Sequence, residues 1–299
     1  MPRFSANLGF LWPDRPLLDR IDAAAAAGFR AVELHWPYDT PAAEVRERCD
    51  ARRVTLLGVN TSRGREGESG LGALPGREAE FAAAVDQAIA FCVAAGGSAI
   101  HCMAGVIGDA DPAAARDTFV ANLRNASRAA EPHGLTLLLE PINPKDAPGY
   151  FYSTVAEGAA VIETVGAPNL RLMFDCYHVA SVGQDVVATL RRFLPLVGHI
   201  QFASVPDRAE PDSGTPDYPD VFRAIDALGY AGWVGAEYRP RAATDDGLGW
   251  LAAAAAAAAA PAVSLMITRR QKERLRELGF TEDAIREMRP AEAHAHLGL

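Results

Sequence analysis

The sequence reads LTLLLEPIN at residues 135–143 and LRLMFDCYH at residues 170–178. Each stretch is a short, β-prone apolar run that closes on a carboxylate, Glu140 in the first and Asp175 in the second. A segment of helical length lies between them and stops at Gly166, the place for a left-handed helix C-cap. A strand, a helix and a second strand in this order predict a parallel βαβ unit.

The same alternation recurs along the chain, in both directions from this unit, until eight strands are predicted. Eight units in about 250 residues favour a single closed (β/α)₈ barrel, the TIM barrel, over an open sheet. No Gly-rich phosphate loop follows the first strand, which weakens a Rossmann-type interpretation. The predicted strands are Phe4–Phe10, Ala31–Trp36, Val54–Asn60, Ala99–Ala104, Leu135–Glu140, Leu170–Asp175, His199–Ala203 and Trp233–Tyr238. The predicted helices include Pro16–Ala27, Pro41–Arg52, Arg77–Ala95, Pro112–Glu131 and Asp217–Ala227.

The barrel pattern occupies residues 1–251, and the remainder of the chain differs in kind. A run of nine alanines predicts a linker or a helical extension over residues 252–267. Residues 268–299 predict a small tail of two short charged helices, Thr268–Leu278 and Thr281–Met288, the first with a capping box. The tail has few large apolar residues, so we expect it to pack on the barrel or to recruit a partner that the sequence does not name.

Charge and composition exclude several classes of partner. The formal net charge is -9, and no block of Lys or Arg provides a footprint for nucleic acid or an anionic membrane. The N-terminus has no apolar signal region, and the alanine run is too short to span a bilayer, so a cytoplasmic protein is expected. The four cysteines are far apart without a CxxC pair, which predicts buried thiols rather than disulfides or a zinc knuckle.

Polar residues at the ends of the predicted strands are the candidates for chemistry, because a barrel places its active site there. Four successive strands deliver oxygen ligands: Glu140, Asp175, Gln201 and Glu237. Three buried carboxylates repel one another unless a cation lies between them, and an all-oxygen set favours Mg²⁺ or Mn²⁺. His178 and His101 are open between structural hydrogen bonding and contact with a substrate, whereas Glu33 and His35 are expected to line or support the pocket.

From its first residue to GLGW at 247–250, the chain resembles the hydroxypyruvate isomerase family of xylose-isomerase-like, metal-dependent barrels. The motifs that carry the resemblance are MPRFSANLGF at the start, GLGALPGRE at 70–78, MAGV at 103–106, EPIN at 140–143, PGYF at 148–151, FDCYH at 174–178, PDRAEP at 206–211 and GWVGAEYRP at 232–240.

The resemblance implies a role for each matching residue. Glu140, Asp175, Gln201 and Glu237 would be the metal ligands, with Glu140 and Glu237 also serving as proton donor and acceptor. Related epimerases have His as the ligand on the seventh strand, so Gln201 departs from that wider pattern. His178 and Arg208 would contact the substrate, and the planar guanidinium of Arg208 suits bidentate binding of a carboxylate. The resemblance does not extend to the alanine run or the tail.

The chemistry that follows from this is an aldose–ketose type isomerisation. Hydroxypyruvate and 2-hydroxy-3-oxopropanoate (tartronate semialdehyde) interconvert through an enediolate when a proton moves between neighbouring carbons. The same site acting on a four-carbon 2-oxo-tetronate, as isomerase or epimerase, is the nearest alternative. Two further readings are metal-dependent phosphodiester cleavage, which the acidic balance disfavours, and a non-catalytic barrel that binds a sugar acid. A homodimer is an open option.

Overall fold

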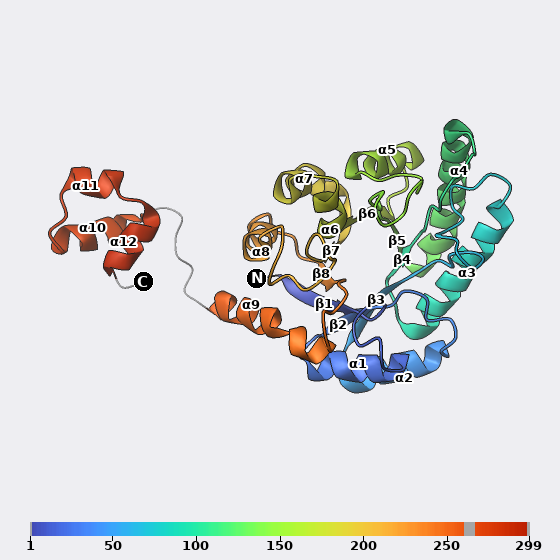
Figure 1. Cartoon of the computed structure of the whole chain (residues 1–299), viewed down its shortest axis with the longest axis horizontal. Coiled ribbons are helices and arrows are strands. Elements are labelled where there is room, and N and C mark those ends of the chain that lie inside the picture. Colours follow the sequence, from blue (N-terminus) through green and yellow to red (C-terminus); the bar gives the residue numbers. More distant parts are fainter. Residues whose placement is uncertain (1, 260–266, 298–299) are drawn as a thin grey trace. The chain divides into compact units, whose positions relative to one another are not determined.

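The computed structural model describes residues 2–259 and 267–297. Its centre is a closed barrel of eight parallel strands that neighbour one another in sequence order, as the sequence predicts (Figure 1). The strands are β1 Arg3–Asn7, β2 Ala31–Glu33, β3 Thr55–Asn60, β4 Ala99–His101, β5 Thr136–Leu139, β6 Leu170–Asp175, β7 Val197–Phe202 and β8 Trp233–Ala236.

Helices follow the strands and cover the outside of the barrel (Figure 1). They are α1 Leu17–Ala26, α2 Ala42–Arg52, α3 Glu78–Ala95, α4 Pro112–Ala130, α5 Val155–Val165, α6 Cys176–Ser181, α7 Val186–Phe193 and α8 Tyr218–Ala227. A further helix, α9 Gly249–Ala259, begins after β8. The five helices predicted by range agree with α1, α2, α3, α4 and α8 to within one residue at each end. Gly96 and Gly166 take the left-handed conformation at the C-caps of α3 and α5, where a side chain would strain the backbone.

Several strands are shorter at their C-terminal ends than the sequence indicates. β2 ends at Glu33 rather than Trp36, and β4 ends at His101 rather than Ala104. The residues that follow are not paired with a neighbouring strand and form the loops of the barrel mouth. Apolar β-prone composition does not distinguish the end of a strand from the start of such a loop.

Strand register sets the level of the polar residues inside the barrel. Asp175 of β6 is opposite Gln201 of β7, and Gln201 is opposite Gly235 of β8. On the other side, Asn7 of β1 is opposite Glu33 of β2. These residues stand at or near the C-terminal ends of their strands, so closure of the sheet turns them toward one another.

An aromatic cluster closes the barrel wall beside β1 and β8. Phe4 packs edge-to-face against Phe202, Phe222 and Trp250, with ring centroids 4.8 to 5.9 Å apart. Trp250 also donates from Nε1 to the Tyr238 hydroxyl at 3.0 Å. Trp250, the second residue of α9, therefore belongs to the core of the barrel.

The chain divides into two compact units, residues 1–250 and residues 251–299. The second unit contains α10 Arg269–Glu277, α11 Glu282–Glu287 and α12 Pro290–Leu297, around a small core of Leu275, Ile285 and Ala293. The sequence predicts two helices in this tail, and α12 is a third. The N-terminal side of the expected linker at 252–267 is helical in α9, whereas residues 260–266 lie outside the described residues.

Two expectations about the chain as a whole can be compared with the structure. The four cysteines all fall within the described residues, and each is buried and free of a disulfide, as predicted. Within residues 2–259 and 267–297, none of the helices combines the length and the apolar character that a bilayer crossing requires.

Candidate active site

The four predicted metal ligands come together inside the barrel mouth. Glu140 follows β5, Asp175 ends β6, Gln201 lies in β7 and Glu237 follows β8. All four are buried, with 2 to 5% of each residue exposed. Buried carboxylates are costly unless they are paired, so their gathering at one level calls for compensating charge.

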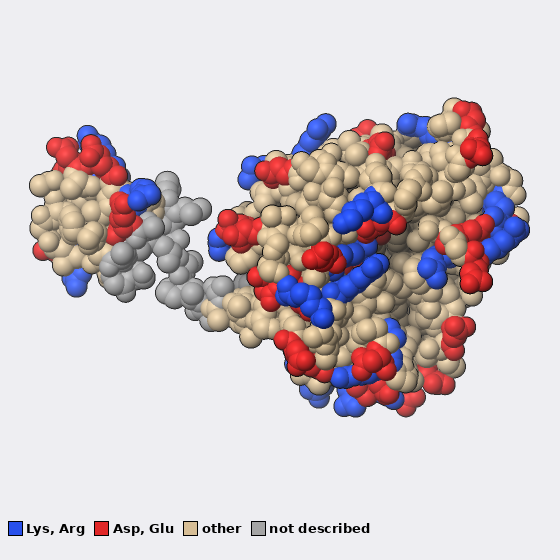
Figure 2. All heavy atoms as spheres, viewed as in Figure 1, with Lys and Arg blue, Asp and Glu red and all other residues tan. Residues whose placement is uncertain are grey.

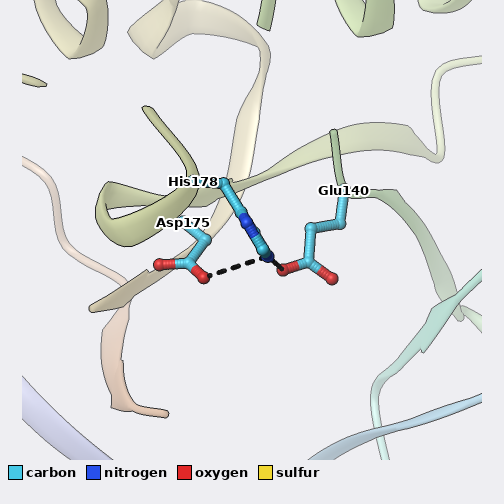
Figure 3. A group of neighbouring side chains, drawn as sticks. All are labelled: Glu140, Asp175 and His178. Atoms are coloured by element: carbon cyan, nitrogen blue, oxygen red, sulfur yellow. Dashed lines mark ion pairs between the residues drawn. The ribbon is translucent and has the colours of Figure 1, made fainter. Parts of the chain in front are cut away.

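Glu140 and Asp175 meet at the imidazole of His178, which lies in the first turn of α6 (Figure 3). His178 Nε2 is 3.4 Å from Glu140 Oε1 and 3.6 Å from Asp175 Oδ2. One ligand atom from each of the three residues lies within 4.8 Å of the others, a spacing consistent with a metal site. Asp175 also fixes its own backbone turn, because its Oδ1 accepts from the Tyr177 backbone N–H at 2.9 Å.

Burial and mutual repulsion shift both of these carboxyl groups toward the protonated form. Burial, followed by the charge of Glu237, raises the pKa of Glu140 to about 8. Burial also raises the pKa of Asp175 to about 7, against the opposing influence of His178 and Arg208. A divalent cation between these groups would remove the cost of ionising them.

Glu237, by contrast, is kept ionised by three hydrogen-bond donors. Asn7 Nδ2 and His35 Nε2 each lie 2.9 Å from Oε1, and Arg208 Nη2 lies 2.6 Å from Oε2. Burial alone would raise the pKa of this carboxyl, but the charge of Arg208 and the contact with His35 lower it to about 2. His35 therefore supports the site through Glu237, as expected from its place after the second strand.

Arg208 reaches the carboxylates from the loop after β7. Its Nη2 also lies 3.4 Å from Asp175 Oδ2, and its Nη1 lies 3.2 Å from Asp146 Oδ2. The guanidinium packs over the rings of Phe10 and Tyr177, at 5.0 and 4.9 Å from their centroids. Its buried Nε–H has no acceptor among the described residues, which leaves one donor for an anionic ligand.

Hydrogen bonds outside the mouth determine which nitrogen of His178 carries the proton. Asn143 Oδ1 accepts from the backbone N–H groups of Lys145 and Asp146, at 2.9 and 3.0 Å, so Nδ2 of this amide faces His178 Nδ1 at 2.7 Å. The Asn143 backbone N–H also donates to Nδ1, at 3.3 Å. Nδ1 must therefore be an acceptor.

The proton of the His178 ring accordingly belongs on Nε2, which faces Glu140 and Asp175. Burial lowers the pKa of His178 to about 4, so the ring is neutral near pH 7. A neutral imidazole with its N–H turned into the site is a hydrogen-bond donor. This arrangement favours contact with a substrate oxygen over ligation of a metal, since a ligating nitrogen must be free of its proton.

His101 is fully enclosed beside Glu140. Its Nδ1 is 3.5 Å from Glu140 Oε2, and its Nε2 has no hydrogen-bond partner in the described part of the chain. Burial lowers the pKa of His101 to about 4, so it is also neutral. The position is compatible with support of Glu140 and with the predicted contact to the substrate.

Gln201 is oriented from beneath the mouth by Glu33. Gln201 Nε2 donates to Glu33 Oε2 at 2.8 Å, and its own Oε1 is buried without a hydrogen-bond partner among the described residues. Glu140 Oε1 is likewise buried without one. Two buried oxygens that accept no hydrogen bond from the described residues, beside two further carboxylates, form a ligand set that fits a hard divalent cation.

The sequence did not single out Asn7, Asn143, Ser5 or His199, although each holds a site residue in place. Asn7 closes the first strand as Glu33 closes the second, and this position after an apolar run is a signal that could have found it. Asn143 lies in the EPIN motif, three residues after Glu140. Ser5 and His199 lie within strands, where composition gives no sign of an inward polar contact.

Comparisons with known proteins identify the family to which this barrel belongs. Residues 21–254 match the family described as xylose isomerase-like TIM barrel. A 2-oxo-tetronate isomerase of Cupriavidus necator is 50% identical over 254 residues, which cover 84% of this chain and 98% of that protein. A putative hydroxypyruvate isomerase of Mus musculus is 42% identical over 259 residues, covering 83% of this chain and 94% of the relative.

The chain belongs to the xylose isomerase-like TIM barrel family. Within that family it is an isomerase of the hydroxypyruvate isomerase and 2-oxo-tetronate isomerase group. Among solved structures, one from Brucella melitensis described as AP endonuclease, family 2, is 38% identical with a TM-score of 0.83, over 85% of this chain and 99% of that one. The predicted family and enzyme class are thereby confirmed.

Proposed function

We propose that this isomerase acts on 2-oxo-tetronate, exchanging its C2 carbonyl and C3 hydroxyl groups with the help of a divalent metal. The observation that carries the metal-dependent mechanism is the set of buried, partly unpaired oxygens of Glu140, Asp175, Gln201 and Glu237. The 50% identical relative supports the four-carbon substrate, so the ranking from sequence alone, which placed hydroxypyruvate first, is reversed. Hydroxypyruvate is the second candidate, supported by the 42% identical relative.

Glu140, Asp175, Gln201 and Glu237 would hold Mg²⁺ or Mn²⁺. When bound, such an ion acts as a Lewis acid that acidifies the C–H beside the substrate carbonyl. His178 would not be a ligand, because hydrogen bonds from Asn143 to Nδ1 keep the ring proton on Nε2.

Glu140 and Glu237 would then transfer protons at the two neighbouring carbons of the substrate. One of Glu140 and Glu237 would remove the proton from C3, the hydroxyl proton would pass from the C3 oxygen to the C2 oxygen, and the other glutamate would give a proton to C2. The carbonyl would then lie at C3 and the hydroxyl at C2. In the metal-free protein the two groups hold protons differently near neutrality, since the pKa of Glu140 is raised to about 8 and that of Glu237 is lowered to about 2. A bound cation would favour the ionised form of both, so their roles would be separated by the contacts of Arg208 and His35 with Glu237.

The substrate carboxylate needs local positive charge in a chain of net charge -9. Arg208 supplies that charge, and its unpaired Nε–H is a donor within the mouth. His178 Nε2–H is a second, neutral donor between Glu140 and Asp175. Together they can orient an acid whose reacting carbons lie beside the two glutamates.

The test is conversion of each acid by protein stripped with EDTA and assayed by NMR in D₂O, with and without added Mg²⁺ or Mn²⁺. We expect metal-restored turnover and deuterium at C2 of the product, faster with 2-oxo-tetronate than with hydroxypyruvate. Preference for hydroxypyruvate would leave the mechanism and change the substrate. Turnover that survives full metal removal would contradict the metal-dependent mechanism.

Phosphodiester cleavage receives less support. The one group of described residues with metal-ligand spacing contains a single histidine, and basic and acidic side chains are interspersed on the face drawn in Figure 2. A DNA-cleaving barrel would be expected to show a basic groove. Metal-dependent nicking of abasic-site DNA at rates comparable to acid isomerisation would overturn this judgement.

A further inference from the structure

Beneath the proposed metal site, Glu33 is the centre of a buried polar group that the isomerase mechanism does not use. Its Oε1 accepts from the Ser5 hydroxyl at 2.6 Å. Its Oε2 accepts from Gln201 Nε2 at 2.8 Å and lies 2.9 Å from His199 Nε2. The four residues come from β1, β2 and β7, and each is 7% exposed or less.

The barrel wall leaves room for this carboxylate. Gly235 of β8 faces it, and a methyl group added there would lie 2.2 Å from Glu33 Oε1. Any larger residue at 235 would displace Glu33 from its three contacts. The glycine in the GWVGAEYRP motif therefore serves close packing, since its backbone is not in the left-handed region.

The contact with Glu33 fixes which end of the Gln201 amide faces away from Glu33. A primary amide has one donor end and one acceptor end, and an acceptor oxygen beside it can be paired only with the NH₂ group. With Nε2 committed to Glu33, Oε1 must face the other way. That oxygen is buried and has no hydrogen-bond partner among the described residues, and Gln201 and Glu33 both line an interior cavity with Asn7 and His101.

We propose that Glu33 is a positioning residue that fixes the orientation of the Gln201 amide, so that Oε1 rather than Nε2 is presented to the metal. Without the acceptor at Glu33, the amide can rotate and offer NH₂, which cannot ligate a cation. The Gln201 amide has one oxygen, whereas each carboxylate has two and can present an oxygen in either orientation. Gln201 therefore depends on a neighbour for its orientation more than Glu140, Asp175 or Glu237 does. The inference rests on the proposed metal site and extends it to the layer beneath.

The experiment measures Mn²⁺ affinity of the full chain by isothermal titration and by the EPR signal of bound Mn²⁺, without reference to turnover. Glu33→Leu keeps the approximate volume and removes the acceptor, and we expect it to weaken Mn²⁺ binding about 10- to 100-fold. Glu33→Gln restores binding to within a few-fold of the wild type, because its carbonyl oxygen can face Gln201 and His199 while its NH₂ donates to the Ser5 hydroxyl.

Comparison of the two variants separates orientation from charge. If Glu33→Gln weakens binding as much as Glu33→Leu, the negative charge of Glu33 is what matters and the inference is overturned. Ser5→Ala is the matched control, since it removes a bond to the same carboxylate without touching Gln201. It should lower thermal stability and leave Mn²⁺ affinity within about twofold, because the Ser5 hydroxyl bonds Glu33 and not a proposed metal ligand.

Gln201→Met distinguishes failure of this inference from failure of the proposed site. Weakened Mn²⁺ binding in Gln201→Met with wild-type affinity in Glu33→Leu would keep Gln201 as a ligand and overturn the role of Glu33. Unchanged affinity in Gln201→Met would remove Gln201 from the ligand set and overturn both. Should Glu33→Leu fail to fold, Glu33→Met, which fills the site with a more adaptable chain, takes its place with the same expected loss.

Discussion

Glu140 and Glu237 have similar burial and opposite electrostatic surroundings. Glu237 is contacted by Arg208, His35 and Asn7, whereas Glu140 Oε1 has no hydrogen-bond partner among the described residues. The difference between them comes from neighbours that lie far away in sequence. Under the proposed mechanism, this contrast would let two chemically identical side chains divide the work of acid and base.

Replacement of either glutamate tests that division. We expect Glu140→Gln and Glu237→Gln each to reduce kcat about 10²- to 10⁴-fold, because an amide cannot carry the proton. Steady-state assays with saturating metal, accompanied by melting curves that show intact folding, provide the measurement. Near wild-type kcat in both variants would remove these residues from the proton transfer.

The tautomer of His178 gives a second prediction at this scale. Asn143→Asp places a carboxylate at Nδ1, which draws the ring proton to that nitrogen and leaves Nε2 as an acceptor toward Glu140 and Asp175. We expect turnover to fall about 10²-fold or more, as when a positioned donor is lost. Ring ¹⁵N chemical shifts report the tautomer directly. Asn143→Ala, which keeps the backbone N–H donor to Nδ1, should retain the wild-type tautomer and lose less activity.

The raised pKa of Glu140 predicts a pH dependence of stability in the metal-free protein. Its folded pKa of about 8 lies above the unfolded value, so the unfolded state releases the proton first and stability falls as pH rises toward 8. His101 and His178, whose pKa values are lowered to about 4, act mainly below about pH 6.5, whereas Asp175, whose pKa is raised to about 7, adds to the decline up to that pH. Thermal melts should show a smaller decline in Glu140→Gln, and an equal decline would contradict the assignment.

At the scale of single elements, α5 shows how a helix next to the site is held at its start. The Thr154 hydroxyl accepts from the Glu157 backbone N–H, and Glu157 Oε2 accepts from the Thr154 backbone N–H at 2.9 Å. This capping box begins the helix at a fixed point after the loop that leaves Glu140. Capping thus limits how far that loop can shift.

Removal of the cap should cost stability without removing activity. We expect Thr154→Ala to lower the free energy of unfolding by about 1 kcal/mol. Urea denaturation of the purified protein measures it. Glu157→Gln retains a side-chain acceptor for the capping box and should change stability by only a few tenths of a kcal/mol, so an equal loss in both variants would speak against the capping explanation.

At the scale of the whole molecule, all proposed site residues lie in the unit of residues 1–250. The second unit has its own small core around Leu275 and Ile285. The point at which the two units separate is set by Trp250, which packs on Phe4 and bonds Tyr238. We therefore expect the residues that activity requires to lie at or before Trp250.

Two truncations test the division. A chain that ends at Ala259 keeps Trp250 and should retain wild-type kcat and KM. A chain that ends at Gly247 loses the aromatic packing and should be destabilised by about 3–5 kcal/mol, as when a buried Trp is deleted. Assays and melting curves of both proteins provide the measurement. Lost turnover in the chain that ends at Ala259, without unfolding, would assign the tail a part in the site.

The sequence by itself determined the barrel and the four oxygen ligands of the proposed site. Alternating apolar and helical runs specify parallel strands, and a closed parallel sheet must bring its C-terminal strand ends together. Glu140, Asp175 and Glu237 could be picked out because each lies at or near the end of such a run, and Gln201 because it is a polar residue inside one. This inference needs only local pattern and the geometry of closure.

The tertiary structure alone decided how those residues are charged and oriented. Asn7 and His35 contact Glu237 across 230 and 202 residues of sequence, and Gln201 contacts Glu33 across 168. Pairings of this kind depend on which inward side chains share a level after the barrel closes. A pKa or an amide orientation is a property of that three-dimensional neighbourhood, and no local pattern in the chain encodes it.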